Sequence, residues 1–415
     1  MSNKQLLDAA KARYQAFCDE GLSLDMTRGK PAPAQLDLSN ELLTCLNTSG
    51  FKAADGTDCR NYGVLDGLPE ARAFFAQYLE VAPNEVIVGG NASLNLMYDA
   101  MTRAMLFGVP GATSPWCRQG KIKWLCPAPG YDRHFNVCAD MGIEMITIEM
   151  TDQGPDMDEV KRLVAADASI KGIWCVPRYS NPTGITYSDD VVDALAQMPT
   201  AAPDFRIFWD NAYNVHHLTD NPKPLRNIMD ACKAAGHADR VYIFGSTSKI
   251  TFAGAGIALL AASSNNLAEA KRHISMQTIG SDKLNQLRHL KFFGDMDGLR
   301  AVMRKHATIL KPKFDMVLQV FRDELASTDL ASWSEPEGGY FISLDTRPGL
   351  AGKVVAMAAT AGVKLTGAGA TYPHGKDPQN RNIRISPSLP SVEEIRKAMA
   401  VVSTCIKIAS WESEA

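Results

Sequence analysis

The sequence predicts an α/β protein with a seven-stranded, mostly parallel sheet in a large domain and a smaller α+β domain beside it. Short apolar, β-branched segments alternate with helical patterns from about residue 85 to residue 263, and this alternation is typical of a parallel sheet. After about residue 290 the pattern changes to one long helical stretch followed by well-separated strands. The chain has 415 residues, 46% of them hydrophobic, which is enough for two or three domains.

The large domain is expected to span residues 46–295 and to contain the seven strands. In chain order these strands are Glu85–Gly90, Trp124–Pro129, Glu144–Met150, Gly172–Arg178, Arg206–Asn211, Arg240–Gly245 and Gly256–Ala262. Stretches such as Leu94–Phe107 and Asp189–Met198, which lie between strands, suit helices. Helices between successive strands allow those strands to run parallel.

The small domain is expected to combine residues 296–415 with residues 1–45. Its longest element is a helix over Leu299–Leu325. The strands predicted after this helix are Gly339–Leu344, Val363–Thr366 and Asn382–Ser386. The last helix starts at Ser391, and Glu394 three positions later completes a capping-box signature.

Composition excludes several classes of function. The formal net charge is −3 and the pI is about 6.3, without long basic runs, so we expect no nucleic-acid or membrane partner. Nine cysteines without a CxxC pair argue against a zinc site and a disulfide framework, and we expect no metal. The N-terminus lacks a signal-peptide pattern, and the longest apolar stretch, Ala253–Ala262, is shorter than the roughly 20 residues that span a bilayer. We expect a cytoplasmic protein that acts on small molecules.

Polar segments follow four of the predicted strands, where ligands bind in open parallel sheets. They are Gly89–Ser93, Tyr179–Gly184, Asp210–Tyr213 and Gly245–Lys249. In the first segment, Gly90, Asn91, Ala92 and Ser93 open a helix, whose free N–H groups and dipole favour an anion. The alternative for this segment is a simple turn before a helix.

Each of the other three segments also has a structural alternative. The run Asn181–Gly184 is a common turn signal. Asp210 follows bulky apolar residues, so its carboxylate needs a cation, although it could instead cap a helix. Lys249 lies among the hydroxyls of Ser246 and Ser248. If Lys249 is buried, its pKa falls and its amine becomes a nucleophile for carbonyls, whereas a surface lysine would do neither.

The order of these residues is what makes the pattern specific. Asn181 with Pro-Thr-Gly, Asp210 with Tyr213, Lys249 after two serines, and Arg384 in a late strand together closely resemble the class I/II aminotransferases. These enzymes have fold type I and depend on pyridoxal 5′-phosphate. The resemblance covers nearly the whole chain.

Longer strings resemble a bacterial subgroup of aspartate aminotransferases that is related to the aminotransferase domain of MocR-type regulators. They are Ile173–Gly184, Phe205–Leu218, Ser246–Gly256 and Gln277–His289. Only about 45 residues precede the segment that leads to the Tyr62 loop. That length is too short for the regulators' winged helix-turn-helix and a linker, so we do not expect a regulator.

The resemblance implies a role for each residue around the cofactor ring. Lys249 would hold pyridoxal phosphate as an internal aldimine and later carry the proton between the substrate α-carbon and the cofactor. Asp210 would pair with the pyridinium nitrogen and keep it protonated, so that the ring acts as an electron sink. Asn181 and Tyr213 would hydrogen-bond the phenolic oxygen, and Tyr131 would stack on the ring. Lys249, Asp210 and Tyr213 are thus the expected catalytic residues.

The resemblance also implies where the phosphate and substrate bind. The phosphate would lie on the helix that follows Gly90, contacting the backbone of 91–93 and the hydroxyls of Ser246 and Ser248. Arg384 would hold the substrate α-carboxylate as a two-pronged fork, next to Asn181. One departure is clear, because most class I enzymes have a phosphate-binding arginine where this chain has Ile257.

The resemblance further implies a homodimer with active sites at its interface. Tyr62, in Asn61-Tyr62-Gly63, matches a tyrosine that reaches the phosphate bound by the partner subunit in the family. The alternative is a tyrosine that only packs in a glycine-containing loop.

We expect a ping-pong aminotransferase that uses aspartate and 2-oxoglutarate. The side-chain carboxylate needs a second cation, and the candidates are Arg28, Lys283 and Arg288. The alternatives are an aminotransferase for neutral or aromatic amino acids and a β-lyase or decarboxylase with the same cofactor. A nicotinamide dehydrogenase using Gly254–Gly256 is disfavoured because these glycines precede a strand instead of following one. A protein that only binds ligands is disfavoured by the presence of Lys249 in this pattern.

Overall fold

The computed structural model describes residues 3–414. Within these residues the main sheet has eight strands in the order β2-β9-β8-β7-β6-β3-β4-β5. The strands are β2 (Val86–Val88), β3 (Lys123–Ala128), β4 (Glu144–Thr151), β5 (Gly154–Pro155), β6 (Ile170–Cys175), β7 (Arg206–Asp210), β8 (Val241–Ser246) and β9 (Ala258–Ala262). Strands β4, β3, β6, β7 and β8 are parallel, whereas β9 runs antiparallel to both β8 and β2.

The prediction of a mostly parallel sheet is confirmed, and each predicted strand is present with slightly different ends. The additional strand is β5, which pairs antiparallel with the end of β4. It has two residues, too few for an apolar alternation to be visible in the sequence.

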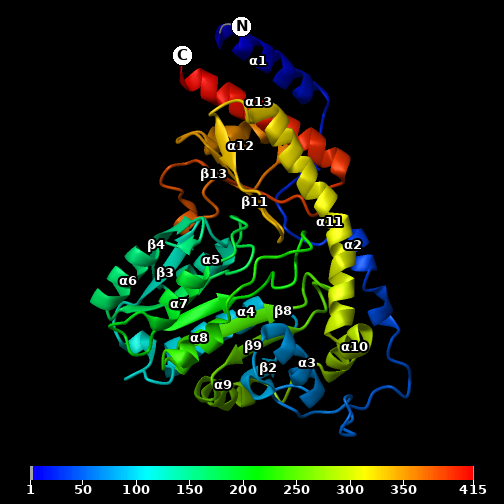
Figure 1. Cartoon of the computed structure of the whole chain (residues 1–415), viewed down its shortest axis with the longest axis vertical. Coiled ribbons are helices and arrows are strands. Elements are labelled where there is room, and N and C mark those ends of the chain that lie inside the picture. Colours follow the sequence, from blue (N-terminus) through cyan, green and yellow to red (C-terminus); the bar gives the residue numbers. More distant parts are fainter. Residues whose placement is uncertain (1–2, 415) are drawn as a thin grey trace.

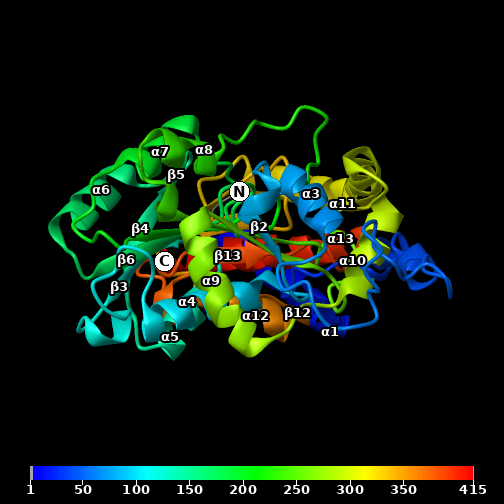
Figure 2. The same cartoon turned by 90° about the horizontal axis from the view of Figure 1, so that it is seen from below.

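Helices cover both faces of the main sheet (Figure 2). They are α3 (Pro69–Leu79), α4 (Ser93–Phe107), α5 (Asp132–Asp140), α6 (Met157–Ala166), α7 (Asp189–Gln197), α8 (Ile228–Ala234), α9 (Ser264–Gln277) and α10 (Lys283–Phe293). Figure 2 shows α6, α7 and α8 on one side of the sheet and α4, α5 and α9 on the other. In β7, Ile207 and Trp209 join the core under the first group, and Phe208 joins the core under the second. Both faces are dry, which explains why the strands read as continuous apolar runs.

A second group of elements lies beyond the carboxyl edge of this sheet (Figure 1). It contains α1 (Asn3–Asp19), β1 (Leu24–Asp25), α11 (Met296–Leu325), β10 (Ala331–Trp333), β11 (Ile342–Thr346), α12 (Ala351–Thr360), β12 (Val363–Lys364), β13 (Asn382–Ile385) and α13 (Val392–Ser413). Its own core includes Phe17, Phe321, Val354 and Val402. The long helix α11 contributes Leu299 to the core of the main sheet and Phe321 to this second core.

The predicted strands of this part are present, but they belong to two sheets. Within the described residues, β10, β11 and β13 form an antiparallel sheet, while β12 pairs parallel with β1. The strand β10 was not predicted. The capping box at Ser391 and Glu394 is confirmed, with both reciprocal hydrogen bonds formed.

The N-terminal helix α1 packs on α13, and the two helices lie side by side in Figure 1. Residues after α1 continue into α2 (Pro33–Asp37), which packs on α11, and the Gln35 amide donates to the Tyr340 hydroxyl at 3.0 Å. The boundaries 46–295, and the joining of 1–45 to 296–415, stay predictions. Among residues 3–414 no helix is long and apolar enough to cross a membrane, and no cluster of three His, Cys, Asp or Glu suits a metal.

Candidate active site

Lys249 lies in a tightly hydrogen-bonded turn directly after β8. The N–H groups of Ile250 and Thr251 both donate to the Thr247 carbonyl, each at 2.9 Å. The Lys249 ammonium nitrogen lies 5.0 Å from the ring centre of Tyr213 and 5.8 Å from that of Tyr340. Burial lowers the pKa of Lys249, although the nearby carboxylate of Asp210 opposes this shift. Because its pKa is lowered, the Lys249 amine loses its proton more readily than the amine of an exposed lysine, which makes it a better nucleophile.

Asp210 ends β7 and has one carboxylate oxygen without a partner. Its Oδ2 lies 3.0 Å from Nε2 of His134, and both side chains are buried. The His134 ring stacks on Trp174 with 4.3 Å between ring centres, which holds the imidazole in place. The buried Oδ1 of Asp210 makes no hydrogen bond with any described residue. Leaving such an oxygen dry is costly, so the site suits a ligand that brings an N–H donor.

Arg384 reaches from β13 to the loops at the edge of the main sheet. Its Nη1 donates to Oδ1 of Asp132 at 3.1 Å and, at a longer 3.5 Å, to Oδ1 of Asn181. The guanidinium carbon lies 4.9 Å from the ring centre of Phe341. The Nε atom is buried without a partner among the described residues. Arg384 thus offers a dry, unsatisfied N–H group to an anion.

Two tyrosines, Tyr131 and Tyr213, lie close to both Asp210 and Arg384. Tyr131 precedes α5, and its ring meets His134 edge-on with 4.9 Å between ring centres. Burial, with a contribution from Asp210, raises the pKa of Tyr131 to about 12. Burial also raises the pKa of Tyr213 well above its usual value, helped by Tyr131 and Asp210 and opposed by Arg384. Both phenols therefore stay protonated at neutral pH and can donate hydrogen bonds.

The start of α4 lies beside the lysine turn. The Ser248 hydroxyl donates to the Asn91 carbonyl at 3.2 Å, and the Ser248 N–H approaches the Ser246 hydroxyl at 3.4 Å. Ala92 caps α4 without a side-chain hydrogen bond, and a side chain added at Gly90 would point into open space. The first N–H groups of α4 are therefore available to an anion that approaches over Gly90.

This constellation can be compared with known proteins. The family model for aspartate amino-transferases matches residues 1–415. The chain belongs to the aspartate aminotransferase family.

Its relatives cover nearly the full length. The chain is 49% identical to a putative aminotransferase of Mycolicibacterium smegmatis, over 96% of this chain and 94% of the relative. It is 48% identical to an aspartate aminotransferase of Corynebacterium glutamicum, over 97% and 93%. The crystal structure of an aspartate transaminase from Corynebacterium glutamicum superposes with a TM-score of 0.98 at 46% identity, covering 100% of this chain and 97% of that one. The protein is an aminotransferase with the type I fold of pyridoxal-phosphate enzymes.

Ile257, the position where the resemblance implies an arginine in many aminotransferases, faces the core. Ile257 is almost fully buried among apolar side chains, and its N–H donates to the Thr247 hydroxyl at 2.9 Å. This hydrogen bond supports the turn that carries Lys249. The polar groups near the start of α4 are the hydroxyls of Ser246 and Ser248 and the first N–H groups of that helix.

The three cations considered for a substrate side chain differ in their surroundings. Lys283 is buried, and its ammonium donates to the Gly63 carbonyl at 2.9 Å. Arg288 is half-buried on α10. Arg28 is exposed, and the following Gly29 lies so close to Phe341 that a side chain there would clash with the ring at 2.2 Å. Among these three, Arg28 directly precedes the glycine that lies against Phe341, a ring that Arg384 also contacts.

Tyr62 lies on the surface of the chain. It is 81% exposed, in the loop whose Gly63 carbonyl is held by Lys283. A tyrosine this exposed does not pack within its own chain, so the packing alternative is disfavoured.

Two residues that contact the predicted site were missed in the sequence. They are Asp132 and His134, which lie one and three positions after Tyr131 in the first turn of α5. No sequence signal marked them, because acidic and polar residues are ordinary in the first turn of a helix.

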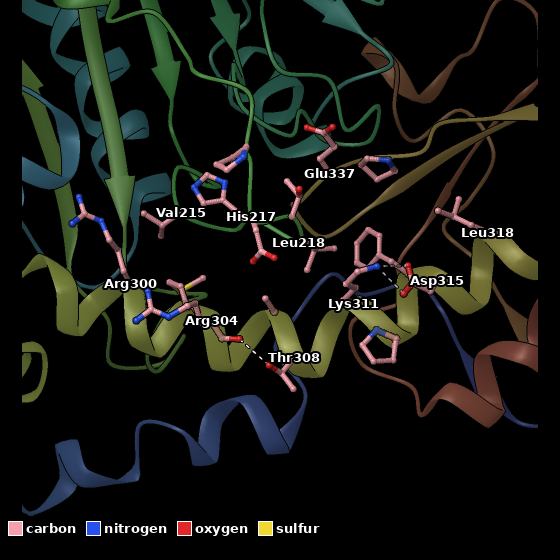
Figure 3. A pocket seen from close by; sticks show the side chains of 18 residues that line it. Val215, His217, Leu218, Arg300, Arg304, Thr308, Lys311, Asp315, Leu318 and Glu337 are labelled. Carbon is pink, nitrogen blue, oxygen red and sulfur yellow. Dashed lines mark hydrogen bonds and ion pairs between the residues drawn. The ribbon is translucent and has the colours of Figure 1, made fainter.

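A large cavity lies apart from these residues (Figure 3). It has a volume of about 1060 Å³ and lies between the loop 215–222 and α11. Arg300, Arg304 and Lys311 line it from α11, as Figure 3 shows. His217 also lines it, and its Nδ1 lies 2.7 Å from the Tyr179 hydroxyl. None of the predicted cofactor residues lines this cavity.

Proposed function

We propose that the protein transfers amino groups between aspartate and 2-oxoglutarate, in two half-reactions, with pyridoxal 5′-phosphate carried on Lys249. The observation that carries this proposal is the convergence of a low-pKa amine, an unpartnered carboxylate oxygen and an unpartnered guanidinium N–H. When bound, the cofactor supplies an electron sink for the bonds at the substrate α-carbon. The same cofactor serves several reactions, so the choice of transamination follows from the family.

The groups around the cofactor ring fit this role. The free Oδ1 of Asp210 suits a protonated ring nitrogen, and His134 fixes the other oxygen so that the carboxylate cannot rotate away. Tyr213 and Asn181 supply donors for the phenolic oxygen, and Tyr131 supplies a ring face. Lys249 holds and moves the proton at the substrate α-carbon, and its lowered pKa makes this transfer easier than for an exposed lysine.

The groups around the phosphate also fit, without an arginine at position 257. Uncapped N–H groups at Ser93 and the hydroxyls of Ser246 and Ser248 can bind phosphate oxygens, and the α4 dipole adds to this attraction. Tyr62 is proposed to donate to the phosphate in the partner subunit of a homodimer, which explains why it is exposed in one chain.

Arg384 is proposed to bind the α-carboxylate, which all amino-acid and oxo-acid substrates share. Aspartate as the preferred substrate is supported by the Corynebacterium glutamicum relative, which is named an aspartate aminotransferase. The cation for the second carboxylate is proposed to be Arg28, because its loop packs on Phe341 beside Arg384. Absence of basic runs and of a membrane-spanning helix among residues 3–414 agrees with a proposed cytoplasmic enzyme.

The test is a coupled assay of the purified protein with 2-oxoglutarate and a panel of amino acids. We expect oxaloacetate and glutamate to form fastest from aspartate, with loss of turnover in Lys249→Ala. Much faster turnover of alanine, aromatic or branched amino acids would remove the substrate assignment. Release of ammonia or carbon dioxide without an oxo-acid acceptor would instead indicate a lyase or a decarboxylase.

A further inference from the structure

The Asp132 carboxylate holds one side of the Arg384 guanidinium. Nη1 of Arg384 donates to Oδ1 of Asp132 at 3.1 Å, and the same nitrogen is the one within reach of Asn181. The other side, with Nε, has no hydrogen bond to the described residues, and Nε is buried. Arg384 therefore has one engaged edge and one vacant edge.

A buried guanidinium needs this arrangement if it is to bind an anion reversibly. The Arg384 side chain is 9% exposed, and a charge that dry is costly without a counter-charge. The Asp132 side chain is 33% exposed, so it supplies a negative charge while keeping much of its own hydration. Since a carboxylate binds two parallel N–H groups, the edge formed by Nε and Nη2 stays available for bidentate binding.

Asp132 is also well placed to fix the direction of that edge. It is the first residue of α5, the helix that begins after Tyr131 and carries His134 against Asp210. Phe341 lies under the guanidinium and limits its rotation from the other side. One short helix thus connects the group that binds the α-carboxylate to the group that faces the cofactor ring.

We propose that Asp132 is a positioning residue that orients Arg384, so that its Nε–Nη2 edge receives the substrate α-carboxylate. The inference rests on the proposed function, in which Arg384 binds that carboxylate. It predicts that removal of Asp132 weakens every substrate through its α-carboxylate and leaves the cofactor site intact.

The experiment uses the holoenzyme with Asp132→Ala, Asp132→Asn and, as a control on the same helix, the exposed Asn136→Ala. Each protein is titrated with two matched pairs, aspartate and 3-aminopropanoate, and alanine and ethylamine, while the visible absorption of the cofactor is recorded. Within each pair the ligands differ only in the α-carboxylate.

We expect Asp132→Ala to weaken the apparent affinity for the amino acids by roughly tenfold to a hundredfold, as for the loss of a charge-assisted hydrogen bond. The affinity for the matched amines should change less than about twofold. Asp132→Asn keeps an acceptor oxygen, so its apparent affinity for the amino acids should lie between those of Asp132→Ala and the unaltered enzyme. Asn136→Ala should behave as the unaltered enzyme does.

Two results would overturn the proposal. Equal weakening of amino acids and amines would mean that Asp132 only stabilises the fold. Tighter binding of amino acids by both variants would mean that Asp132 competes with the substrate. If aspartate leaves the unaltered enzyme unchanged while alanine alters its absorption, the substrate assignment fails, and the alanine pair still tests Asp132.

Discussion

His134 and Asp210 form a buried pair in which the histidine keeps the carboxylate in one orientation. We predict that His134→Ala lowers kcat by roughly tenfold to a hundredfold, because Oδ2 of Asp210 then lacks its partner and the carboxylate is no longer held toward the proposed ring nitrogen. Asp210→Ala should lower kcat further, since it removes the charge itself. Steady-state kinetics and cofactor retention after dialysis measure both effects. His237→Ala is the control, since the Nδ1–H of that ring donates to the Ala196 carbonyl away from the site. Wild-type kinetics in His134→Ala would contradict the prediction.

We expect Lys249 to lower the free energy of unfolding of the cofactor-free protein. Its pKa is lowered by burial, so the cofactor-free fold disfavours the charged amine. We predict that Lys249→Met raises the free energy of unfolding of the cofactor-free protein by on the order of 1 kcal/mol at neutral pH. Because the folded-state pKa lies below the unfolded value of about 10.4, the unaltered protein gains stability as pH rises through this interval. The difference between the two proteins should therefore shrink toward pH 10.

Denaturant titrations at several pH values measure this difference. The matched control is Lys311→Met, which replaces an exposed lysine paired with Asp315. A surface change of this kind should stay within about 0.5 kcal/mol at all pH values. A stability gap for Lys249→Met that grows with pH would rule out a lowered pKa.

The site residues that could be predicted from the sequence are those whose residue type is unusual at their position in the chain. A lysine, an aspartate and an asparagine directly after apolar strands stand out, because a strand end at the carboxyl edge of a parallel sheet is where ligands bind. Asp132 and His134 do not stand out, since acidic and polar residues are ordinary in the first turn of a helix. Their contacts with Arg384 and Asp210 depend on the packing of three separate chain segments.

At the scale of elements, the strands of the main sheet were predictable because they are buried on both faces. β2 and β9, for example, are buried along their whole length, and each is an unbroken apolar run. β10 is only partly buried and follows a polar loop, which hides it in the sequence. β12 has a recognisable pattern, but its pairing with β1 joins positions more than 300 residues apart, and no local pattern records such a contact.

The turn that carries Lys249 depends on one threonine. The Thr247 hydroxyl accepts the N–H of Ile257 at 2.9 Å and lies 3.2 Å from Nε2 of His289. We predict that Thr247→Val, which keeps the shape, lowers the free energy of unfolding by about 1–3 kcal/mol because it leaves a buried N–H unpaired. It should also lower kcat, since Lys249 becomes less well positioned.

A shift of the denaturation midpoint with an unchanged m-value would identify this as a loss of stability in the native state. Thr308→Val is the matched control, because that hydroxyl is exposed and donates within α11 to the Arg304 carbonyl. If both substitutions had equally small effects, the hydroxyl of Thr247 would not support the turn.

At the scale of the whole molecule, several large apolar side chains are exposed on the surface of the chain instead of packing in its core. Tyr62, Met276 and Ile279 are 81%, 83% and 59% exposed, and the Gly63 carbonyl lies close to Gly280, so these side chains come from neighbouring segments. Exposed large side chains that gather in this way are typical of a contact with another chain. We therefore expect a surface around Tyr62, and not Tyr62 alone, to contact a partner subunit.

We predict that Tyr62→Phe, which removes only the hydroxyl, weakens cofactor affinity by roughly tenfold while the protein stays dimeric, because one hydrogen bond to the phosphate is lost in each site. Met276→Asp should act differently, by shifting the protein toward monomers and lowering cofactor affinity in proportion. Sedimentation velocity and cofactor titration, read together, separate the two effects. Tyr98→Phe, which removes an exposed hydroxyl bonded to Asp140, is the matched control for loss of a phenol. A monomeric unaltered enzyme with full activity would show that each chain completes its own site and that Tyr62 has no part in it.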